Sequence, residues 1–312
     1  MDRSPDQPLD LSSTLLMILV CAIWGGAFVA VKIGFRDMPP LGSAALRFFI
    51  STLVLLVVAR SQRVPILYPW FESCVIVLLA LLFCYANLTI YIGTAHTTSG
   101  RATVFFYTQP IFLAVLAHFF LSNDPLTMRK GCGLLFAMCG LAVLFSNKLS
   151  GGQSSTALGD LIVLSGALAT AVQNLIIKRA TGKIHPVALI FWGTAVSALL
   201  LGICWWTLEQ NATFVFSARA ISSVLYLSLI SAAFGFVVFA WLLQRHSAIR
   251  VTALVFLAPV FGVFFARLLL QETLTSVQLL GVAGVCAGVY IVNSSGAPRA
   301  QEPLPQEAPA KA

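Results

Sequence analysis

The sequence of 312 residues carries very little charge. Only 10% of its residues are Asp, Glu, Lys or Arg, whereas a soluble domain has about 25%. Hydrophobic residues make up 59%, and the mean hydropathy is +0.92. This balance excludes an ordinary soluble domain and indicates a chain that lies in a lipid bilayer. The net charge is +8, but the basic residues stand singly or in pairs, so we expect no binding to nucleic acid.

The sequence also lacks the motifs of common catalytic and nucleotide-binding sites. It contains no HExxH, no GxSxG, no Walker A motif and no cluster of acidic residues that could bind a metal ion. We therefore expect no enzymatic activity, no ATP-driven pumping, no metal and no cofactor. The seven cysteines show no CxxC spacing and all fall within apolar stretches, so they are predicted to be small packing residues.

What the sequence has instead is ten apolar stretches, each long enough to cross the hydrocarbon core of a membrane, which takes about 20 residues. They cover residues 13–33, 40–59, 70–93, 99–121, 128–146, 158–178, 186–207, 219–243, 248–270 and 275–293. The predicted fold is an all-α integral membrane protein of ten transmembrane helices. No basic cluster precedes the first stretch and Trp24 stands near its middle, so it is predicted to be a true span rather than a signal peptide.

The predicted organisation is two similar halves with short polar segments around them. It comprises an N-terminal segment (1–12), a first five-helix repeat (13–146), a linker (147–157), a second five-helix repeat (158–293) and a disordered tail (294–312) rich in Pro, Ala and Glu. With the N-terminus inside, the cytoplasmic side holds twelve Lys and Arg against seven on the other side. By the positive-inside rule, both termini are predicted to be cytoplasmic, with the chain in the inner membrane.

The internal repeat is visible in two similar stretches, RATVFFYTQPIF and RVTALVFLAPVF. A shift of 149 residues places Arg101 on Arg250 and Pro110 on Pro259. Because each half has an odd number of helices, the halves must enter the membrane in opposite senses, as in many secondary transporters. Such symmetry supplies two states, one open to each side. Gene duplication also builds channels and passive membrane proteins, so the repeat alone leaves those classes open.

Each repeat carries a proline inside its fourth span. A proline removes one backbone hydrogen bond and clashes with the preceding turn, a defect of about 3 kcal/mol in water. A membrane tolerates it only where protein or water satisfies the freed group. Pro110 and Pro259 are therefore predicted to face the interior at matching kinks, as gating positions or as plain packing kinks. Gly25 and Gly26 are predicted to allow close backbone approach in the first span.

Several motifs together resemble a known family. They are AIWGGAFVAVK, ALRFF, TTSGRATVFFYTQPIF and PVFGVFFARLLLQETLTSVQLLGVAGVCAGVYI. Over residues 13–293 the sequence resembles the drug/metabolite transporter (DMT) superfamily, specifically its ten-helix branch, the EamA family. The resemblance implies a secondary transporter that moves a small organic solute, usually outward. It also implies a central cavity walled by helices 1, 3, 4, 6, 8 and 9, with helices 5 and 10 peripheral.

The candidate substrate-binding residues are polar or aromatic side chains far from the ends of these helices. They are Trp24, Phe28, Tyr85, Asn87, Tyr107, Gln109, Gln173, Asn174 and Phe256. Uncharged polar groups in hydrocarbon usually face other helices or water. The amides of Gln109, Gln173 and Asn174 are not satisfied by their own helices and are predicted to touch substrate or cavity water. Trp24 is either a substrate contact or a packing aromatic.

Ionisable residues are scarce inside the spans. Every Asp and Glu lies at or beyond a span end, and Arg101 and Arg250 begin spans, where their side chains are expected to reach the membrane surface. Arg47 stands about two turns into its span, and His118 bears an imidazole, a group that can carry a proton. These two are the candidates for charge coupling, with a structural ion pair and an interfacial histidine as the alternatives.

The expected substrate follows from the neutral, aromatic character of the candidate residues. Such a cavity suits a zwitterionic or uncharged amphiphilic solute, because a phosphate ester would require clustered Lys or Arg. We expect efflux of neutral or aromatic amino acids or related metabolites, with a drug exporter or a channel-like facilitator as alternatives. The expected partners are this solute and the lipid bilayer. The following glycines are predicted to pack helices, with a homodimer contact as one option: Gly133, Gly140, Gly281, Gly284 and Gly288.

Overall fold

The computed structural model describes residues 9–34, 37–122, 124–149, 157–209, 212–271 and 274–294. All secondary-structure elements in these ranges are helices. Most of the expected N-terminal segment, most of the linker and the tail from residue 295 lie outside the described residues.

The helices follow one another along the chain with short connections. They are α1 (Leu11–Gly34), α2 (Pro40–Ser61), α3 (Trp70–His96), α4 (Ser99–Phe106), α5 (Gln109–Phe120), α6 (Met128–Leu144), α7 (Ser146–Leu149), α8 (Ala157–Arg179), α9 (Pro186–Leu208), α10 (Ala218–Leu225), the π-helix η1 (Tyr226–Phe236), α11 (Val237–Arg245), α12 (Ala248–Leu254), α13 (Leu257–Leu270) and α14 (Ser276–Asn293). Within the described ranges, nine single or interrupted helices are long and apolar enough to cross a membrane. The 17-residue α6 supplies the tenth span, so the predicted ten-helix membrane fold is confirmed.

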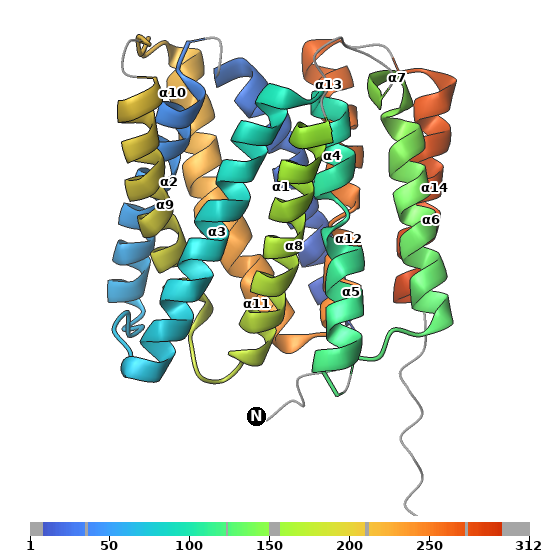
Figure 1. Ribbon diagram of the computed structural model, residues 1–312, viewed down its shortest axis with the longest axis horizontal. Helices are drawn as coiled ribbons and strands as arrows, with labels where there is room; N and C mark the ends of the chain where they lie inside the picture. Colours follow the sequence, from blue (N-terminus) through green and yellow to red (C-terminus); the bar gives the residue numbers. More distant parts are fainter. Residues whose placement is uncertain are drawn as a thin grey trace, which may run out of the picture.

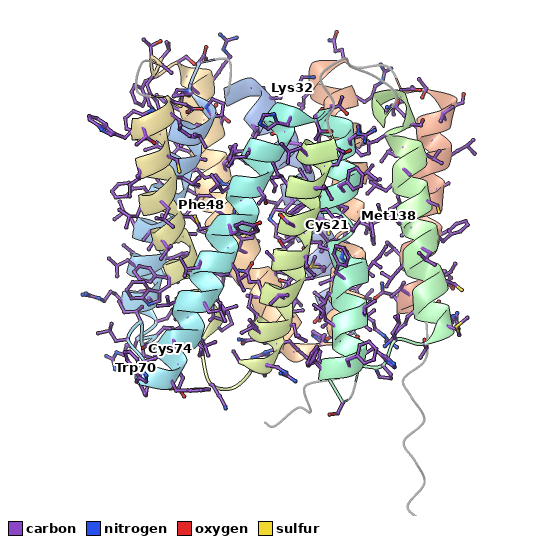
Figure 2. All side chains as sticks on the ribbon, viewed as in Figure 1. Cys21, Lys32, Phe48, Trp70, Cys74 and Met138 are labelled. Atoms are coloured by element: carbon purple, nitrogen blue, oxygen red, sulfur yellow. The ribbon has the colours of Figure 1, made fainter. Side chains whose placement is uncertain are left out.

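The two halves of the chain interleave to form one bundle (Figure 1). The largest helix contacts each join a first-half helix to a second-half helix: α6 with α14, α2 with α9, α3 with α8 and α1 with α13. Side chains fill the spaces between the ribbons (Figure 2), and Cys21 and Phe48 are fully buried there. Trp70, at the lower end of the bundle, is 84% exposed. Neither half can therefore bury its apolar faces without the other.

Helices α6 and α14 pack on one side of the bundle through glycines (Figure 1). A Cβ atom built on Gly140 would lie 2.4 Å from the backbone nitrogen of Val285, and one on Gly288 would lie 2.3 Å from that of Ala137. No side chain fits at such a distance, so the two backbones meet directly. These glycines thus pack two helices of one chain rather than two subunits. As the family resemblance implied, the fifth and tenth spans are peripheral.

The fourth span of each half is interrupted near its proline. α4 ends at Phe106 and α5 begins at Gln109, whereas α12 ends at Leu254 and α13 begins at Leu257. Pro110 and Pro259 each follow the interruption and are buried. The interruptions stand where the sequence predicts kinks, and a gating role for the prolines stays a prediction.

The glycine contact between α6 and α14 yields a stability test. Gly140→Ala forces the two backbones apart, and such overpacking typically costs about 1–3 kcal/mol. Gly202 on α9 has no atom within 4 Å of its would-be Cβ, so Gly202→Ala should be neutral or stabilise by up to about 1 kcal/mol through helix propensity. Thermal unfolding of the purified variants in detergent measures both. Equal midpoints for the two alanine variants would contradict this packing.

Candidate functional site

The two interrupted helices meet in the centre of the protein. Tyr107 follows α4 and Phe256 precedes α13, and the shift of 149 residues relates these two positions. Their ring centroids lie 6.4 Å apart, and the side chains are 5% and 0% exposed. The backbone groups freed by the interruptions therefore lie inside protein rather than in lipid, as a membrane-spanning chain requires.

A small cavity of about 70 Å³ lies beside this contact. Its lining residues come from both halves and none is charged; they are Trp24, Phe83, Gln109, Gln173, Asn174, Ile177, Ile190, Phe236, Phe239, Ala240 and Val255. A cavity of this size holds a few water molecules. An organic solute therefore requires the surrounding helices to move apart.

One wall of the cavity is aromatic. The ring of Trp24 lies 5.6 Å from that of Phe236 and 5.4 Å from that of Phe239, and Phe83 meets Phe236 edge-on at 5.2 Å. The indole N–H of Trp24 donates a hydrogen bond of 3.2 Å to the carbonyl oxygen of Ser231 in the π-helix. Trp24 therefore offers its ring, rather than its N–H group, to the cavity.

Three amide side chains supply hydrogen-bonding groups to the same cavity. Gln109 begins α5, and Gln173 and Asn174 lie on α8; all three line the cavity and are at most 8% exposed. The Oε1 atom of Gln109 is buried with no hydrogen-bond partner among the described residues. The cavity thus combines an aromatic wall with three amide groups, the kind of lining that is typical of small-molecule sites.

The remaining predicted binding residues lie outside this cavity lining. Phe28 and Tyr85 are about half exposed, and Tyr85 shares a hydrogen bond of 2.9 Å with Ser165. The amide nitrogen of Asn87 donates to the carbonyl oxygen of Phe83, one turn earlier in its own helix. Tyr107 and Phe256 are buried at the helix interruptions next to the cavity. Four of the nine predicted residues therefore line it together: Trp24, Gln109, Gln173 and Asn174.

Sequence reasoning missed most of the aromatic wall. Phe83, Phe236 and Phe239 stand in helices that are apolar nearly all round, so nothing in their spacing separates cavity-facing from lipid-facing positions. The 11-residue π-helix that ends at Phe236 was also not predicted. Such helices are rare and often occur at functional sites. Its carbonyl groups accept hydrogen bonds from side chains on other helices, including Ser51 to Ser228 at 2.9 Å.

The two charge-coupling candidates also lie outside the cavity lining. The guanidinium of Arg47 stacks 5.0 Å from the ring centre of Phe48, and its Nε atom is buried without a hydrogen-bond partner among the described residues. His118 is exposed near the lower end of α5, and its Nδ1 accepts from the backbone N–H of Leu126 at 3.4 Å. A coupling role for either stays a prediction.

The predicted glycines beside Trp24 mediate close packing. A Cβ on Gly25 would lie 2.7 Å from the backbone nitrogen of Gly262 in α13, and one on Gly26 would lie 2.6 Å from the hydroxyl of Tyr226 in the π-helix. The first span therefore lies directly against α13 and the π-helix. A role for these glycines in gating stays a prediction.

At the lower end of the bundle in Figure 1, where α5 ends and α12 begins, Asp124 joins the two halves. Asp124 is 1% exposed and accepts hydrogen bonds from Lys130 at 2.8 Å, from the hydroxyl of Ser247 at 2.8 Å and from the backbone N–H of Ile249 at 3.0 Å. It thereby caps the first turn of α12 across the boundary between the halves. Arg250 on that helix is buried beside it and attracted by its charge, so the expectation that Arg250 reaches the membrane surface is wrong.

At the upper end of the bundle in Figure 1, an acidic residue of the second half likewise bonds to residues of the first half. Asp160 on α8 accepts a hydrogen bond of 2.7 Å from Thr97 and pairs with Arg101 on α4. This pair is more open, because the side chain of Arg101 is 32% exposed. α12 is buried throughout, whereas only Gly100 and Ala102 are buried in α4. The protein is therefore more tightly closed at its lower end.

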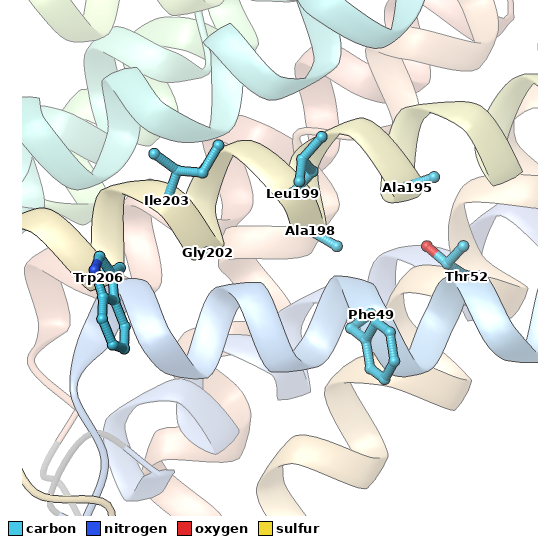
Figure 3. A pocket seen from close by; sticks show the side chains of 8 residues that line it. All are labelled: Phe49, Thr52, Ala195, Ala198, Leu199, Gly202, Ile203 and Trp206. Atoms are coloured by element: carbon cyan, nitrogen blue, oxygen red, sulfur yellow. The ribbon is translucent and has the colours of Figure 1, made fainter. Parts of the chain in front are cut away.

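A larger groove lies elsewhere among the described residues and has different chemistry. About 590 Å³ in volume, it runs between α2 and α9 and is lined by Phe49, Thr52, Ala195, Ala198, Leu199, Gly202, Ile203 and Trp206 (Figure 3). The hydroxyl of Thr52 already bonds to Phe48 and Thr194. Apart from the indole N–H of Trp206, the other side chains that line the groove are apolar, and the groove faces outward between two membrane-spanning helices.

The buried contact below the cavity yields a second stability test. Asp124→Ala leaves the ammonium group of Lys130 buried without its partner, and breaking a buried pair in this way costs about 3–5 kcal/mol. We expect a clearly lower midpoint of thermal unfolding in detergent. The double variant Asp124→Ala/Lys130→Met removes both charges and should recover part of the loss. A single variant as stable as the native protein would show that Asp124 does not hold the halves together.

Comparisons with known proteins agree with this architecture. The model of the EamA-like transporter family matches residues 11–146 and again residues 157–294. The chain is 30% identical to the uncharacterized transporter YoaV of Bacillus subtilis, over 88% of this chain and 94% of that protein. It is 29% identical to a probable amino-acid metabolite efflux pump of Escherichia coli, over 89% and 93%.

A solved structure shares the fold. It has a TM-score of 0.78 at 18% sequence identity and covers 90% of this chain and 96% of its own. The resemblance inferred from the sequence motifs is thus confirmed by the family match, the relatives and the helical bundle. The chain is a multi-pass membrane protein that transports small molecules, and it belongs to the EamA-like transporter family.

Proposed function

We propose that the protein exports a small, neutral amphiphilic solute, such as a neutral or aromatic amino acid or a related metabolite, by alternating access. The observation that carries this proposal is the uncharged cavity at the contact of the two interrupted helices, with one aromatic wall and three amide groups. A solute with an apolar body and a hydrogen-bonding end matches both walls.

Alternating access accounts for the size of the cavity and for the contacts that close it. A cavity of about 70 Å³ has room for only a few waters and must widen to take a solute. One cross-half contact through Asp124 lies below it and another through Asp160 lies above. Because the repeats are inverted, opening one contact while closing the other exposes the cavity first to one side of the membrane and then to the other.

The chemistry of the cavity favours the proposed solute class over phosphate esters. No Lys or Arg lines the cavity, and phosphate recognition usually relies on such cations. The names of the relatives in Escherichia coli and Salmonella typhimurium, probable amino-acid metabolite efflux pumps, support the same class. The distribution of Lys and Arg supports an orientation with both termini in the cytoplasm, as expected for a chain in the inner membrane.

The proposal predicts selective, saturable flux from proteoliposomes. Vesicles loaded with a mixture of neutral amino acids, charged amino acids and sugar phosphates should lose the neutral amino acids fastest, as measured by mass spectrometry. Asn174→Leu removes one cavity amide at similar volume and should slow this flux about tenfold or more, the effect expected for about 1.5 kcal/mol of lost hydrogen bonding. The control Asn147→Leu changes an exposed asparagine on α7.

Three outcomes would contradict the proposal. They are preferential loss of sugar phosphates, flux that shows no saturation or counterflow, and flux that is the same in Asn174→Leu and Asn147→Leu. Unsaturable flux would instead favour a channel-like facilitator.

A further inference from the structure

We infer that Gln109 selects solutes that carry an ammonium group, by accepting a hydrogen bond from that group through its Oε1 atom. The inference rests on the proposed function and names the chemical group by which the cavity recognises its solute. Its basis is a buried acceptor that has no partner among the described residues and that lies beside a wall of aromatic rings.

The first step is the unsatisfied acceptor. Gln109 is 8% exposed and lines the cavity, and its Oε1 has no hydrogen-bond partner among the described residues. A buried polar atom left without a partner costs about 1–3 kcal/mol. Buried polar atoms are nearly always satisfied in folded proteins, so a bound group that donates a hydrogen is expected at this position.

The second step is that the surrounding electrostatics favour a positively charged donor. The rings of Trp24, Phe236 and Phe239 pack together on the aromatic wall, and the faces of such rings attract cations. The N–H group of Trp24 is already bonded to Ser231, so it does not offset this effect. An amide oxygen together with these rings forms a neutral site whose partial charges suit an ammonium group.

The third step concerns the helix interruption beside Gln109. The backbone N–H groups of Tyr107, Thr108, Ile111 and Phe112 all donate to carbonyl groups of their own segment, and Pro110 has no N–H group. The interruption therefore supplies few free backbone donors, which are what a carboxylate would need here. A carboxylate on the same solute is better served by the amide N–H groups of Gln173 and Asn174.

The fourth step is that the acceptor is present in only one repeat. The shift of 149 residues places Ala258, which is fully buried, at the position equivalent to Gln109. The second half thus offers no matching side-chain oxygen at this position. The ammonium group of a bound solute is consequently expected towards α5 rather than towards α13.

The test compares two solutes that differ in the amino group. L-Phenylalanine carries an ammonium group, and 3-phenylpropionate has the same ring and carboxylate without it. In the native protein, efflux of phenylalanine from proteoliposomes should be about tenfold or more faster than efflux of 3-phenylpropionate. A factor of this size is expected for a hydrogen bond to a charged group. Gln109→Met should remove this preference by slowing phenylalanine alone, whereas the same change at the exposed Gln271 should keep it.

A conservative variant and a stability measurement complete the test. Gln109→Glu keeps an acceptor oxygen whether or not its carboxyl group is protonated. This variant should therefore retain part of the preference for phenylalanine. Because Oε1 has no partner in the part of the chain that the structure describes, Gln109→Met should unfold at the same temperature as the native protein or higher, without solute.

The outcomes separate this inference from the proposed function. Equal efflux of both solutes by the native protein, or an unchanged preference in Gln109→Met, would overturn the role of Gln109 while leaving transport intact. If the native protein moves neither solute, the proposed function fails for aromatic solutes. In that case the stability measurement still tests the inference, because unfolding of Gln109→Met at a clearly lower temperature than the native protein would overturn it.

Discussion

The structure depends on the contact between two interrupted helices in the middle of a membrane protein. An interruption exposes backbone groups that lipid cannot satisfy, so each break must be covered by protein. Here the two breaks cover each other, with Tyr107 against Phe256, and the other helices enclose them. The same arrangement leaves a small cavity beside the breaks, where the chain places the amides of Gln109, Gln173 and Asn174. One constraint thus accounts for the symmetric fold and for the position of the site.

The halves are symmetric in backbone but not in side-chain chemistry. The aromatic Trp24 and the amide of Gln109 have no counterparts in the second half, where Thr170 and Ala258 stand. The lower contact through Asp124 is buried, whereas the upper contact through Asp160 is partly exposed. In the alternating-access cycle that we propose, these differences set which state is favoured and how a solute lies in the cavity.

Much of the fold was predictable because its determinants are local in sequence. Apolar runs of sufficient length gave the spans, and Pro110 and Pro259 marked the two interruptions. The amide residues were found because an amide in an apolar helix is an exception that needs a partner. Phe83 and Phe236 were not predicted, because a phenylalanine in an apolar helix looks the same in the sequence whether it faces the cavity or the lipid. The bond from Asp124 to Ser247 joins residues 123 positions apart, and no local pattern reveals such a pair.

The measurement that tests alternating access most directly is a pair of distances between spin labels, taken with and without solute. Labels at the exposed Met128 and Arg245 flank the lower contact, and labels at the exposed Thr94 and Leu158 flank the upper one. The account predicts that solute shifts the two distance distributions in opposite directions, one pair separating as the other approaches. Distances that stay fixed while solute is transported, or that change in the same direction, would contradict it.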